Sequence, residues 1–470
     1  MAGPHLTVGT FESLSRSGVF SAVSWICKEL IAAGARPYFV GGCVRDAILG
    51  LKLSDFDVEI FGMPFNDVEK LLSRKFPVER TGKIFCVLKI RGFPIDVSVP
   101  RFETKFGNGH RDFFIGELGD CDVKLAASRR DFTINAIYFD VANGKIVDEF
   151  GGVGDLRGGI LRHVGGKFSE DPLRVLRGMQ FAGRFNLVAA DDTVALCEKL
   201  SINAISRERI FSEWEKLMLS AQRPSLGLKF LKATGWLKFF PEIEELDRCA
   251  QDSVKHPEGS VFEHTCLALD VFAKTRIGDR GEDLILGFAT LCHDIGKPYV
   301  TTRDERGIHH YGHGEAGEGP AVEFLRSING PNYLVESILP LVKFHMIPWL
   351  LYENHGSDAE ILQLANDVGR IDRLVRLWHI DLHGRIGADA IGSVEAENWL
   401  VTAAKRLGVF ANKPAPIILG RDLILHGLCP SEKFSKILDQ CFAAQLARKF
   451  TDHQSGIAYL MEIIQNGCAL

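Results

Sequence analysis

Hydrophobic and polar positions alternate with two different periods in the N-terminal part of the chain. Apolar residues recur at helical spacing over residues 18–34, which predicts an amphipathic helix, and residues 66–76 predict a second helix. The short apolar runs 37–40, 84–90 and 95–99 predict strands. This order of elements predicts a small mixed sheet with flanking helices.

The pattern is mostly helical after this part, and it includes a tail that reads as helices from residue 417 to residue 463. A chain of 470 residues has room for about three domains. We therefore predict an α+β protein that begins with a mixed-sheet head and continues as a helical neck, a histidine-rich helical domain and a helical tail. The predicted bounds of these four parts are 1–150, 151–245, 246–400 and 401–470.

Charge and cysteine content narrow the environment of the protein. The formal net charge is −5, so an RNA partner would need locally clustered arginine and lysine. The 11 cysteines are scattered without a Cys-x-x-Cys pair, which favours reduced thiols in the cytoplasm. The first residues lack the pattern of a signal peptide, and no apolar run approaches transmembrane length, so we expect no membrane partner.

A diglycine and a pair of carboxylates accompany the first two predicted strands. Gly41 and Gly42 follow the first strand, and Asp55 and Asp57 lie on the next one. The diglycine lets the backbone approach a ligand, and the helix after it would offer N–H groups to phosphates. The two carboxylates point to one face and suit Mg²⁺. Each feature alone is more often a plain turn or a solvated strand edge, but both together indicate nucleotidyl transfer with two metal ions.

A third carboxylate, Asp96, lies in the predicted strand 95–99. Its plain alternative is an acid on an edge strand. Next to the upstream pair, however, a carboxylate on a neighbouring strand is what a two-metal site needs, as a ligand or as a base for the attacking hydroxyl.

The strings GGCVRD at 41–46 and SDFD at 54–57 resemble the signature of class II CCA-adding tRNA nucleotidyltransferases and the related bacterial poly(A) polymerases. The resemblance implies a polymerase β-like head in which the two glycines and Arg45 seat phosphates. It also implies that the two aspartates bind two Mg²⁺ ions, and the family carries its third acid at the position of Asp96.

The string RRDFTINA at 129–136 matches the second motif of this family along its length. Adjacent arginines can hold a triphosphate, and Asp131 and Asn135 lie one helical turn apart. The resemblance implies that Asp131 and Arg130 contact the ribose and the phosphates, whereas a solvated basic helix end is the plain alternative. The Gly-rich stretch 101–120 corresponds to a flexible loop in the family, and a plain surface loop is equally open.

The string EDPLRVLR at 170–177 is a second chemical centre. Asp171 can accept from an exocyclic amine and Arg174 can donate to the adjacent ring nitrogen, a pattern that cytosine and adenine share. Glu170 could hold the Arg174 guanidinium, and Arg177 lies on the same side of the helix. A surface salt bridge is the plain alternative. The resemblance favours nucleotide selection, because Glu-Asp-x-x-Arg is the protein-templating motif of class II enzymes.

The string LCHDIGKP at 291–298 resembles the kernel of an HD domain, a helical metal-dependent phosphohydrolase fold. The residues that match its ligand pattern by position are His264, His293, Asp294 and Asp381. Two further histidines, His313 and His345, could complete a second metal site. Any single histidine is more often structural, and the identity of the divalent metal stays open.

The resemblance implies template-independent addition of C and A to the 3′ end of tRNA from CTP and ATP. Addition of A only, addition of CC only and poly(A) synthesis remain open within the same chemistry. From another class, the HD domain could be the main activity, as a phosphohydrolase or 2′,3′-cyclic phosphodiesterase, and a pure binding module is least favoured. The number of subunits is not indicated.

The tail carries the basic residues that we expect to grip the tRNA body, with a solvated helix face as the alternative. They are Lys433, Lys436, Arg448 and Lys449.

Overall fold

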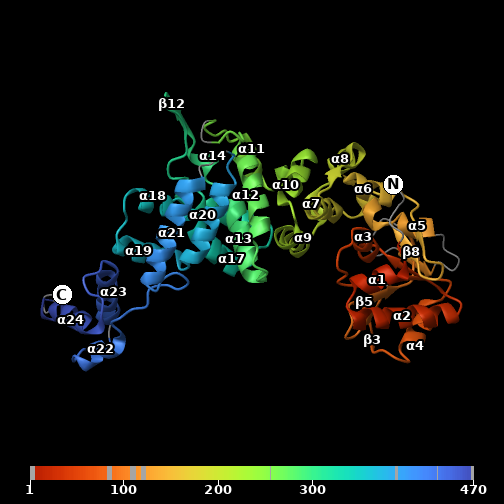
Figure 1. Ribbon diagram of the computed structural model, residues 1–470, viewed down its shortest axis with the longest axis horizontal. Helices are drawn as coiled ribbons and strands as arrows, with labels where there is room; N and C mark the ends of the chain where they lie inside the picture. Colours follow the sequence, from red (N-terminus) through yellow and green to blue (C-terminus); the bar gives the residue numbers. More distant parts are fainter. Residues whose placement is uncertain are drawn as a thin grey trace. The chain divides into compact units, whose positions relative to one another are not determined.

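The computed structural model describes residues 6–81, 87–105, 113–117, 123–253, 256–386, 390–430 and 432–466. The chain consists of two compact units, Met1–Ile205 and Ser206–Leu470. The first unit combines a sheet with helices, and the second is almost entirely helical (Figure 1). This arrangement confirms the predicted α+β class.

A seven-stranded mixed sheet forms the centre of the first unit. The strand order is β3-β4-β5-β2-β1-β8-β9, and all neighbours are antiparallel except β2 and β5, which are parallel. The strands are β1 (Arg36–Val40), β2 (Phe56–Phe61), β3 (Val78–Thr81), β4 (Val87–Ile90), β5 (Ile95–Ser98), β8 (Tyr138–Asp140) and β9 (Lys145–Val147). The predicted strands 37–40 and 95–99 are confirmed, and the described part of 84–90 is β4.

Helices cover one face of this sheet and complete its main core. The helix α2 (Ser17–Ala32) buries Phe20, Val23 and Leu30, which lie on one helical face, as predicted. Residues of α2 pack in one buried cluster with residues of β1, β2, β4 and β5. The helices α1 (Val8–Leu14), α3 (Gly42–Ile48) and α4 (Phe65–Leu72) belong to the same cluster. The helix α5 (Val123–Ala127) packs on the opposite face, in a second cluster with Tyr38 and Val40.

The described parts of the predicted Gly-rich loop are strands. Its two flanks pair as antiparallel strands β6 (Arg101–Lys105) and β7 (Phe113–Glu117). The polar centre of the stretch, residues 106–112, lies outside the described residues. The two flanks contain aromatic and β-branched residues that favour strands, which the Gly-rich composition of the whole stretch concealed; they are Phe102, Thr104, Phe113, Phe114 and Ile115.

Short helices and strands complete the first unit. They are η1 (Thr133–Asn135), α6 (Gly152–Gly158), β10 (Ile160–Leu161), η2 (Gly166–Glu170), α7 (Leu173–Phe185), β11 (Val188–Ala189), α8 (Asp191–Cys197) and η3 (Ile202–Ala204). The helix α7 begins directly after Pro172, as the sequence predicted.

The second unit packs most of its helices around α12, α13, α17 and α20, whereas the last three helices form a separate buried cluster. Its elements are α9 (Arg207–Ser220), α10 (Pro224–Ala233), η4 (Trp236–Phe239), α11 (Pro241–Arg248), α12 (Val261–Thr275), α13 (Arg280–Cys292), α14 (Lys297–Val300), β12 (Thr302–Asp304), β13 (Gly307–His309), α15 (His313–Ala316), α16 (Glu318–Ser327), α17 (Asn332–Phe344), α18 (Ile347–Glu353), α19 (Asp358–Val368), α20 (Ile371–His383), α21 (Ala390–Arg406), α22 (Gly420–Leu425), α23 (Glu432–Leu446) and α24 (His453–Asn466). The hairpin β12–β13 projects from this helical body (Figure 1).

The two compact units meet after Ile205, which none of the four predicted bounds anticipates. The predicted division at residue 150 falls inside the first unit, where the amide of Thr133 donates to the carbonyl of Arg162. A functional division into head, neck, HD domain and tail therefore stays a prediction.

Among the described residues, one helical stretch, Asn332–Glu353, is long and apolar enough to cross a membrane, which corrects the expectation that no apolar run approaches this length. It consists of two helices, α17 and α18, with His345 at the break between them. Both helices pack against other helices of the second unit, and the break carries a buried histidine. We therefore read this stretch as part of a protein core.

Candidate active sites

The turn between β1 and α3 requires glycine at position 41. Gly41 has φ +66°, and a Cβ there would lie 2.8 Å from Arg130 Nη1 and 3.7 Å from Asp57 Oδ2. Any larger residue would push the arginine away from the aspartate. The predicted diglycine turn is confirmed, and its first glycine fits closely between two predicted site residues.

Three carboxylates gather beside this turn. Asp57 of β2 and Asp96 of β5 are register partners on parallel strands, so both side chains leave the sheet on one face. Asp55 precedes β2 by one residue, which corrects its predicted place on the strand. Burial raises the pKa of Asp57 to about 6, opposed by Arg130 and supported by Asp55 and Asp96. Carboxylates that raise one another's proton affinity fit a divalent cation, which would replace the proton.

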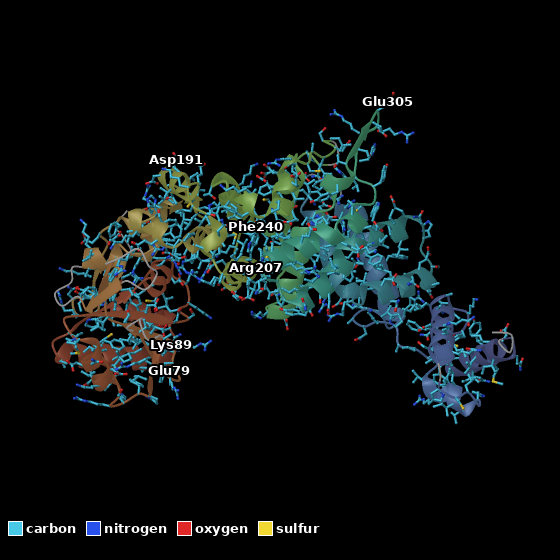
Figure 2. All side chains as sticks on the ribbon, turned by 180° about the vertical axis from the view of Figure 1, so that it is seen from behind. Glu79, Lys89, Asp191, Arg207, Phe240 and Glu305 are labelled. Atoms are coloured by element: carbon cyan, nitrogen blue, oxygen red, sulfur yellow. The ribbon has the colours of Figure 1, made fainter. Side chains whose placement is uncertain are left out.

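Asp96 has one other charged neighbour among the described contacts. Its Oδ2 lies 3.6 Å from Lys89 Nζ of β4, and both side chains are well exposed (Figure 2 labels Lys89). An exposed ion pair contributes little free energy. The Asp96 carboxylate can therefore turn to a cation at small cost.

We expect Mg²⁺ to stabilise the first unit more strongly at higher pH. The pKa of Asp57 is raised from 3.8 to about 6. Because the folded-state pKa is raised, this group destabilises the metal-free fold above pH 6, and the effect vanishes below pH 3.8. Thermal unfolding of the full chain should show a larger Mg²⁺-induced rise in Tm at about pH 7.5 than at about pH 5. An equal rise at both values would contradict the assignment of Asp57 to a cation site.

Arg130 is a fixed charge next to Asp57. Its Nη2 lies 3.2 Å from Glu59 Oε2, its Nε donates to Tyr138 Oη at 3.3 Å, and its Nη1 donates to the carbonyl of Asn135 at 3.4 Å. Tyr138 Oη in turn donates to Glu59 Oε2 at 2.5 Å. The guanidinium predicted to contact phosphates is thus engaged by the protein, and its charge opposes the rise in the pKa of Asp57.

Arg45 is likewise built into the core, with only 4% of its surface exposed. Its Nε donates to Asp46 Oδ1 at 2.8 Å, and its Nη1 donates to Asn135 Oδ1 at 2.6 Å. The guanidinium lies 4.1 Å from the centre of the Phe185 ring. This placement differs from the predicted phosphate seat, because a buried and paired guanidinium is not offered to a ligand.

Asp131 joins the string at 129–136 to α7. Its Oδ1 accepts from the Phe132 amide at 2.8 Å and from Asn135 Nδ2 at 3.0 Å, and its Oδ2 accepts from Arg177 Nε at 2.7 Å. Burial alone would raise the pKa of Asp131, but the Arg177 guanidinium and these hydrogen bonds lower it. The predicted closeness of Asp131 and Asn135 is confirmed. The link to Arg177 has no signal in the sequence spacing.

Arg174 is held at the start of α7 by backbone oxygens. Its Nη1 donates to the carbonyl of Lys167 at 2.7 Å, and its Nη2 donates to the carbonyl of Arg129 at 2.8 Å. Asp171 Oδ1 accepts from the Leu173 amide at 3.1 Å and so caps this end of the helix. Two backbone carbonyls therefore hold the Arg174 guanidinium, which was the role predicted for Glu170. A role of Glu170 stays a prediction.

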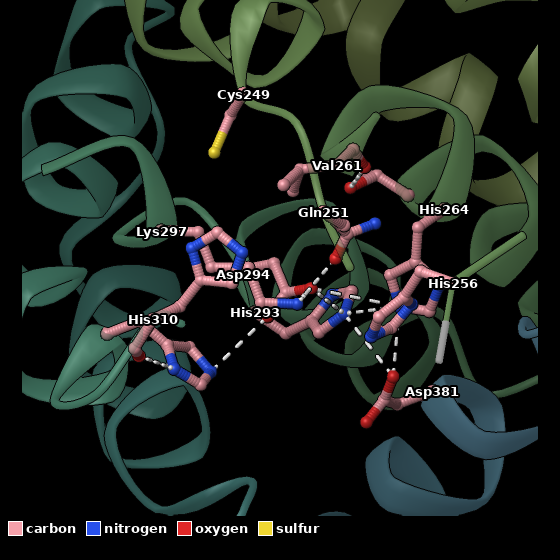
Figure 3. A network of polar contacts seen from close by, with 12 residues as sticks. Cys249, Gln251, His256, Val261, His264, His293, Asp294, Lys297, His310 and Asp381 are labelled. Atoms are coloured by element: carbon pink, nitrogen blue, oxygen red, sulfur yellow. Dashed lines mark hydrogen bonds and ion pairs between the residues drawn. The ribbon is translucent and has the colours of Figure 1, made fainter. Parts of the chain in front are cut away.

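A second polar cluster lies in the second unit (Figure 3). His264 of α12, His293 after α13 and Asp381 of α20 form its first group. His264 Nε2 lies 3.2 Å from His293 Nε2 and 2.9 Å from Asp381 Oδ1. All three residues are at most 2% exposed. Asp381, which matched the ligand pattern only by its position in the sequence, therefore lies beside the two histidines.

Asp294, His313 and His345 form a second group next to the first. His313 Nε2 lies 3.0 Å from His345 Nε2, and Asp294 Oδ1 lies 3.4 Å and 3.6 Å from these two atoms. The other oxygen, Asp294 Oδ2, lies 3.3 Å from His293 Nε2. One carboxylate thus connects both groups.

The histidine tautomers suit metal binding. The Nδ1 atoms of His293, His313 and His345 each lie 2.7 Å from the carbonyl oxygen of the residue three positions earlier. A carbonyl only accepts, so each Nδ1 carries the hydrogen and each Nε2 presents a lone pair. Lone pairs that face one another at 3.0 Å repel unless a cation lies between them. The donor set therefore fits one or two divalent ions.

Two residues around this cluster were missed by the sequence analysis. Glu258 Oε1 lies 3.2 Å from His264 Nδ1 and 2.9 Å from His256 Nδ1. Lys297 Nζ donates to Asp294 Oδ2 at 2.6 Å. Lys297 lies inside the string LCHDIGKP, so the sequence did indicate that it is near the cluster. Glu258 lies before α12 and belongs to no motif.

Three family models match separate parts of the chain. A model described as the poly A polymerase head domain matches residues 37–162, and one described as a probable RNA and SrmB-binding site of polymerase A matches residues 191–246. The HD domain model matches residues 261–377. The carboxylate site and most of the histidine cluster lie inside the first and the last of these matches.

Curated relatives decide the family. A multifunctional CCA protein of Nitrosococcus oceani is 33% identical over 398 residues, which cover 83% of this chain and 93% of the relative. The chain belongs to the multifunctional CCA protein family. A multifunctional CCA protein of Laribacter hongkongensis is 34% identical over 362 residues, with 75% of this chain and 86% of the relative covered.

Solved structures agree on the fold of this family member. The CCA-adding enzyme of Bacillus stearothermophilus in complex with CTP has a TM-score of 0.64 at 22% identity, covering 96% of this chain and 99% of that one. The Thermotoga maritima CCA-adding enzyme complexed with tRNA has a TM-score of 0.60 at 16% identity, covering 97% and 98%. These likenesses confirm the predicted fold class along nearly the whole chain.

Proposed function

We propose that the chain adds C and A to the 3′ end of tRNA from CTP and ATP without a nucleic-acid template, and so builds or repairs the CCA end. The observation that carries this proposal is the alignment of Asp57 with Asp96 beside Asp55 and the glycine turn. The names of the relatives point to the same reaction. The matched RNA-binding model agrees with an RNA substrate.

Asp55, Asp57 and Asp96 would hold the divalent cations, for which we propose Mg²⁺. Bound cations would neutralise charge on the triphosphate and make the tRNA 3′ hydroxyl a stronger nucleophile. Around them, the charge of Arg130 favours the ionised form of Asp57, and glycine at position 41 leaves both side chains undisturbed. The protein's main contribution is to position these groups before the substrates arrive.

Nucleotide selection would fall to the start of α7. The guanidinium of Arg174 is fixed by two carbonyls, and Asp171 is fixed by its cap, so both are preorganised. Fixed groups discriminate well, because a base with the reverse pattern of donors and acceptors leaves them unpaired. Asp171 would accept a hydrogen bond from the exocyclic amine, and Arg174 would donate one to the adjacent ring nitrogen. Cytosine and adenine share this pattern.

Arg174→Ala is expected to blur the choice of nucleotide. Loss of a charged donor should reduce the preference for CTP and ATP over UTP and GTP by about tenfold to a hundredfold in kcat/KM. The measurement is single-nucleotide incorporation on a tRNA transcript with each of the four nucleotides. Arg157→Ala, on the exposed side of α6, is the matched control. Unchanged selectivity in the Arg174 variant would remove it from the selecting pair.

The proposed reaction is tested with two tRNA transcripts, one that lacks CCA and one that ends in CC. With Mg²⁺, CTP and ATP, complete CCA on the first transcript supports the proposal. Addition of A only to the second, addition of CC only, or long A tails would each replace it with the corresponding alternative. Absence of any incorporation would reject nucleotidyl transfer for this chain.

The histidine cluster supports a second proposed activity, hydrolysis of phosphate esters in the second unit. The observation behind it is the shared carboxylate of Asp294 between two groups of metal donors. Divalent ions there would supply a nucleophilic hydroxide at neutral pH. We further propose that the protein works in the cytoplasm, where the cysteines of the described part, all free thiols, stay reduced.

A further inference from the structure

A basic pocket lies next to the histidine cluster and belongs to neither proposed site. Its volume is about 400 Å³, and its walls come from the residue before α10, from α12, and from the end of α20 with the residues after it. The charged or titratable residues that line it are Arg223, Asp270, Lys274, His383 and Arg385.

The charge of this pocket favours an anion. Among the described residues of the wall, Asp270 is the one acid. Its carboxylate is already engaged by the amide and hydroxyl of Ser225, at 3.0 Å and 2.7 Å, and by Arg223 Nε at 3.3 Å. Lys274 is exposed at the wall. Arg385 Nε is buried and has no hydrogen-bond partner among the described residues. A compact oxyanion with several acceptor oxygens matches these donors, and phosphate is the common one.

Two residues that line the pocket contact residues of the histidine cluster. Arg385 Nη2 donates to Asp381 Oδ2 at 2.8 Å, and Asp381 Oδ1 lies 2.9 Å from His264 Nε2. On the next residue, the amide of Ile386 donates to Glu258 Oε2 at 3.4 Å, and Glu258 Oε1 lies 3.2 Å from His264 Nδ1. The segment of Arg385 and Ile386 therefore lines the pocket and also contacts the cluster. Arg385 binds Asp381 directly, and Ile386 binds Glu258, which in turn contacts His264.

We propose that this pocket binds a phosphate group, and that its occupation strengthens metal binding at the histidine cluster. A phosphate beside Arg385 would share the positive charge that now acts mainly on Asp381, the carboxylate in direct contact with the guanidinium. The Asp381 carboxylate would then attract a cation more strongly. By reciprocity, a metal ion in the cluster strengthens phosphate binding by the same factor. The second half of this proposal rests on the metal site of the proposed function, whereas phosphate binding itself does not.

Phosphate binding is measured on the full chain after chelator treatment, which removes any contribution from bound metal. Inorganic phosphate is titrated and followed by its ³¹P linewidth. Lys274→Ala and Arg223→Ala should each weaken the binding by about tenfold, whereas Lys238→Ala, an exposed lysine of η4, should leave it unchanged. Equal binding by wild type and both pocket variants overturns the proposal.

Coupling is measured by Mn²⁺ titration, followed by electron paramagnetic resonance, in an Asp57→Asn background that removes the carboxylate site. Phosphate should raise the Mn²⁺ affinity of the cluster, and Lys274→Ala should reduce that gain by about fivefold. Phosphate that ligates the metal directly acts equally in both proteins, so it cancels. An equal gain in both, or no Mn²⁺ bound at the cluster, overturns the coupling. Absence of Mn²⁺ binding would also reject the metal site of the proposed function. Whether the pocket binds phosphate would still be decided by the titration after chelator treatment.

Two sources can supply the phosphate group, a free nucleotide and an RNA backbone. ATP and a short single-stranded RNA are therefore added in turn as competitors of the Lys274-dependent phosphate signal. Displacement by ATP alone identifies a nucleotide, and displacement by RNA identifies the backbone. Failure of both to displace phosphate overturns the pocket as a physiological phosphate site.

Discussion

Asp57→Asn is expected to lower kcat/KM for nucleotide addition by about a thousandfold or more, because it removes a charge that must balance a divalent cation and the triphosphate. The substitution keeps the size of the side chain and its place on β2. The deficit should appear with both CTP and ATP, because the carboxylate acts on the reacting phosphates and not on the base. Single-turnover extension of a tRNA transcript at saturating Mg²⁺ measures it.

The same variant should be more stable than the wild type when metal is absent. The raised pKa of Asp57, about 6, shows that its ionised form is disfavoured in the fold. A neutral amide avoids this cost, so the free energy of unfolding at neutral pH should rise by about 1 kcal/mol. Lower activity together with higher stability separates a lost cation site from a damaged fold.

Asp67→Asn provides the matched control for this pair of results. Asp67 lies on α4 of the same unit, is exposed, and has Lys70 Nζ at 3.4 Å. Its activity and stability should stay close to wild type. If Asp57→Asn retained addition within about tenfold of the control, the carboxylate alignment would not be the catalytic centre.

Asp294→Asn is expected to abolish metal binding at the histidine cluster and the hydrolysis that depends on it. Both Asp294 oxygens are used, one towards His313 and His345 and the other towards His293. An amide has only one oxygen and no charge, so neither group of donors stays complete. We expect at least about a hundredfold loss of metal affinity, measured by Mn²⁺ titration.

Nucleotide addition should remain within about twofold in this variant, because the carboxylate site lies in the other compact unit. Asp304→Asn, on the β12–β13 hairpin with His309 as its partner, is the control for charge removal in the second unit. Retention of metal by Asp294→Asn at wild-type affinity would show that Asp294 is not a ligand.

The carboxylate site could be predicted because strand geometry decides which side chains share a face. The apolar runs placed Asp57 and Asp96 on strands, and the family resemblance supported Asp96 as the third acid. The spacing argument for Asp55 was wrong in detail, because Asp55 lies one residue before β2. Only the parallel register of β2 and β5 had to come from the structure. The period-two pattern of a strand predicts which side chains share a face, but it does not predict which strands are neighbours.

The partners of Arg45 and Arg130 could not be predicted from the sequence. Arg45 and Arg130 were assigned to phosphates by motif, yet each finds protein partners, among them Asn135 and Glu59. A motif gives the residue type and its position, but the partners of a guanidinium are distant in sequence and depend on tertiary packing. Glu258 was missed for the same reason, since nothing in its neighbourhood in the sequence shows that it approaches His264.

The backbone contacts of the histidines bear on the free-energy cost of metal binding proposed for the cluster. His293, His313 and His345 are oriented by backbone carbonyls, so their Nε2 atoms face the centre of the cluster before any ion binds. A divalent ion would then bind with little reorganisation of these side chains, and less of the binding free energy would be spent on ordering them.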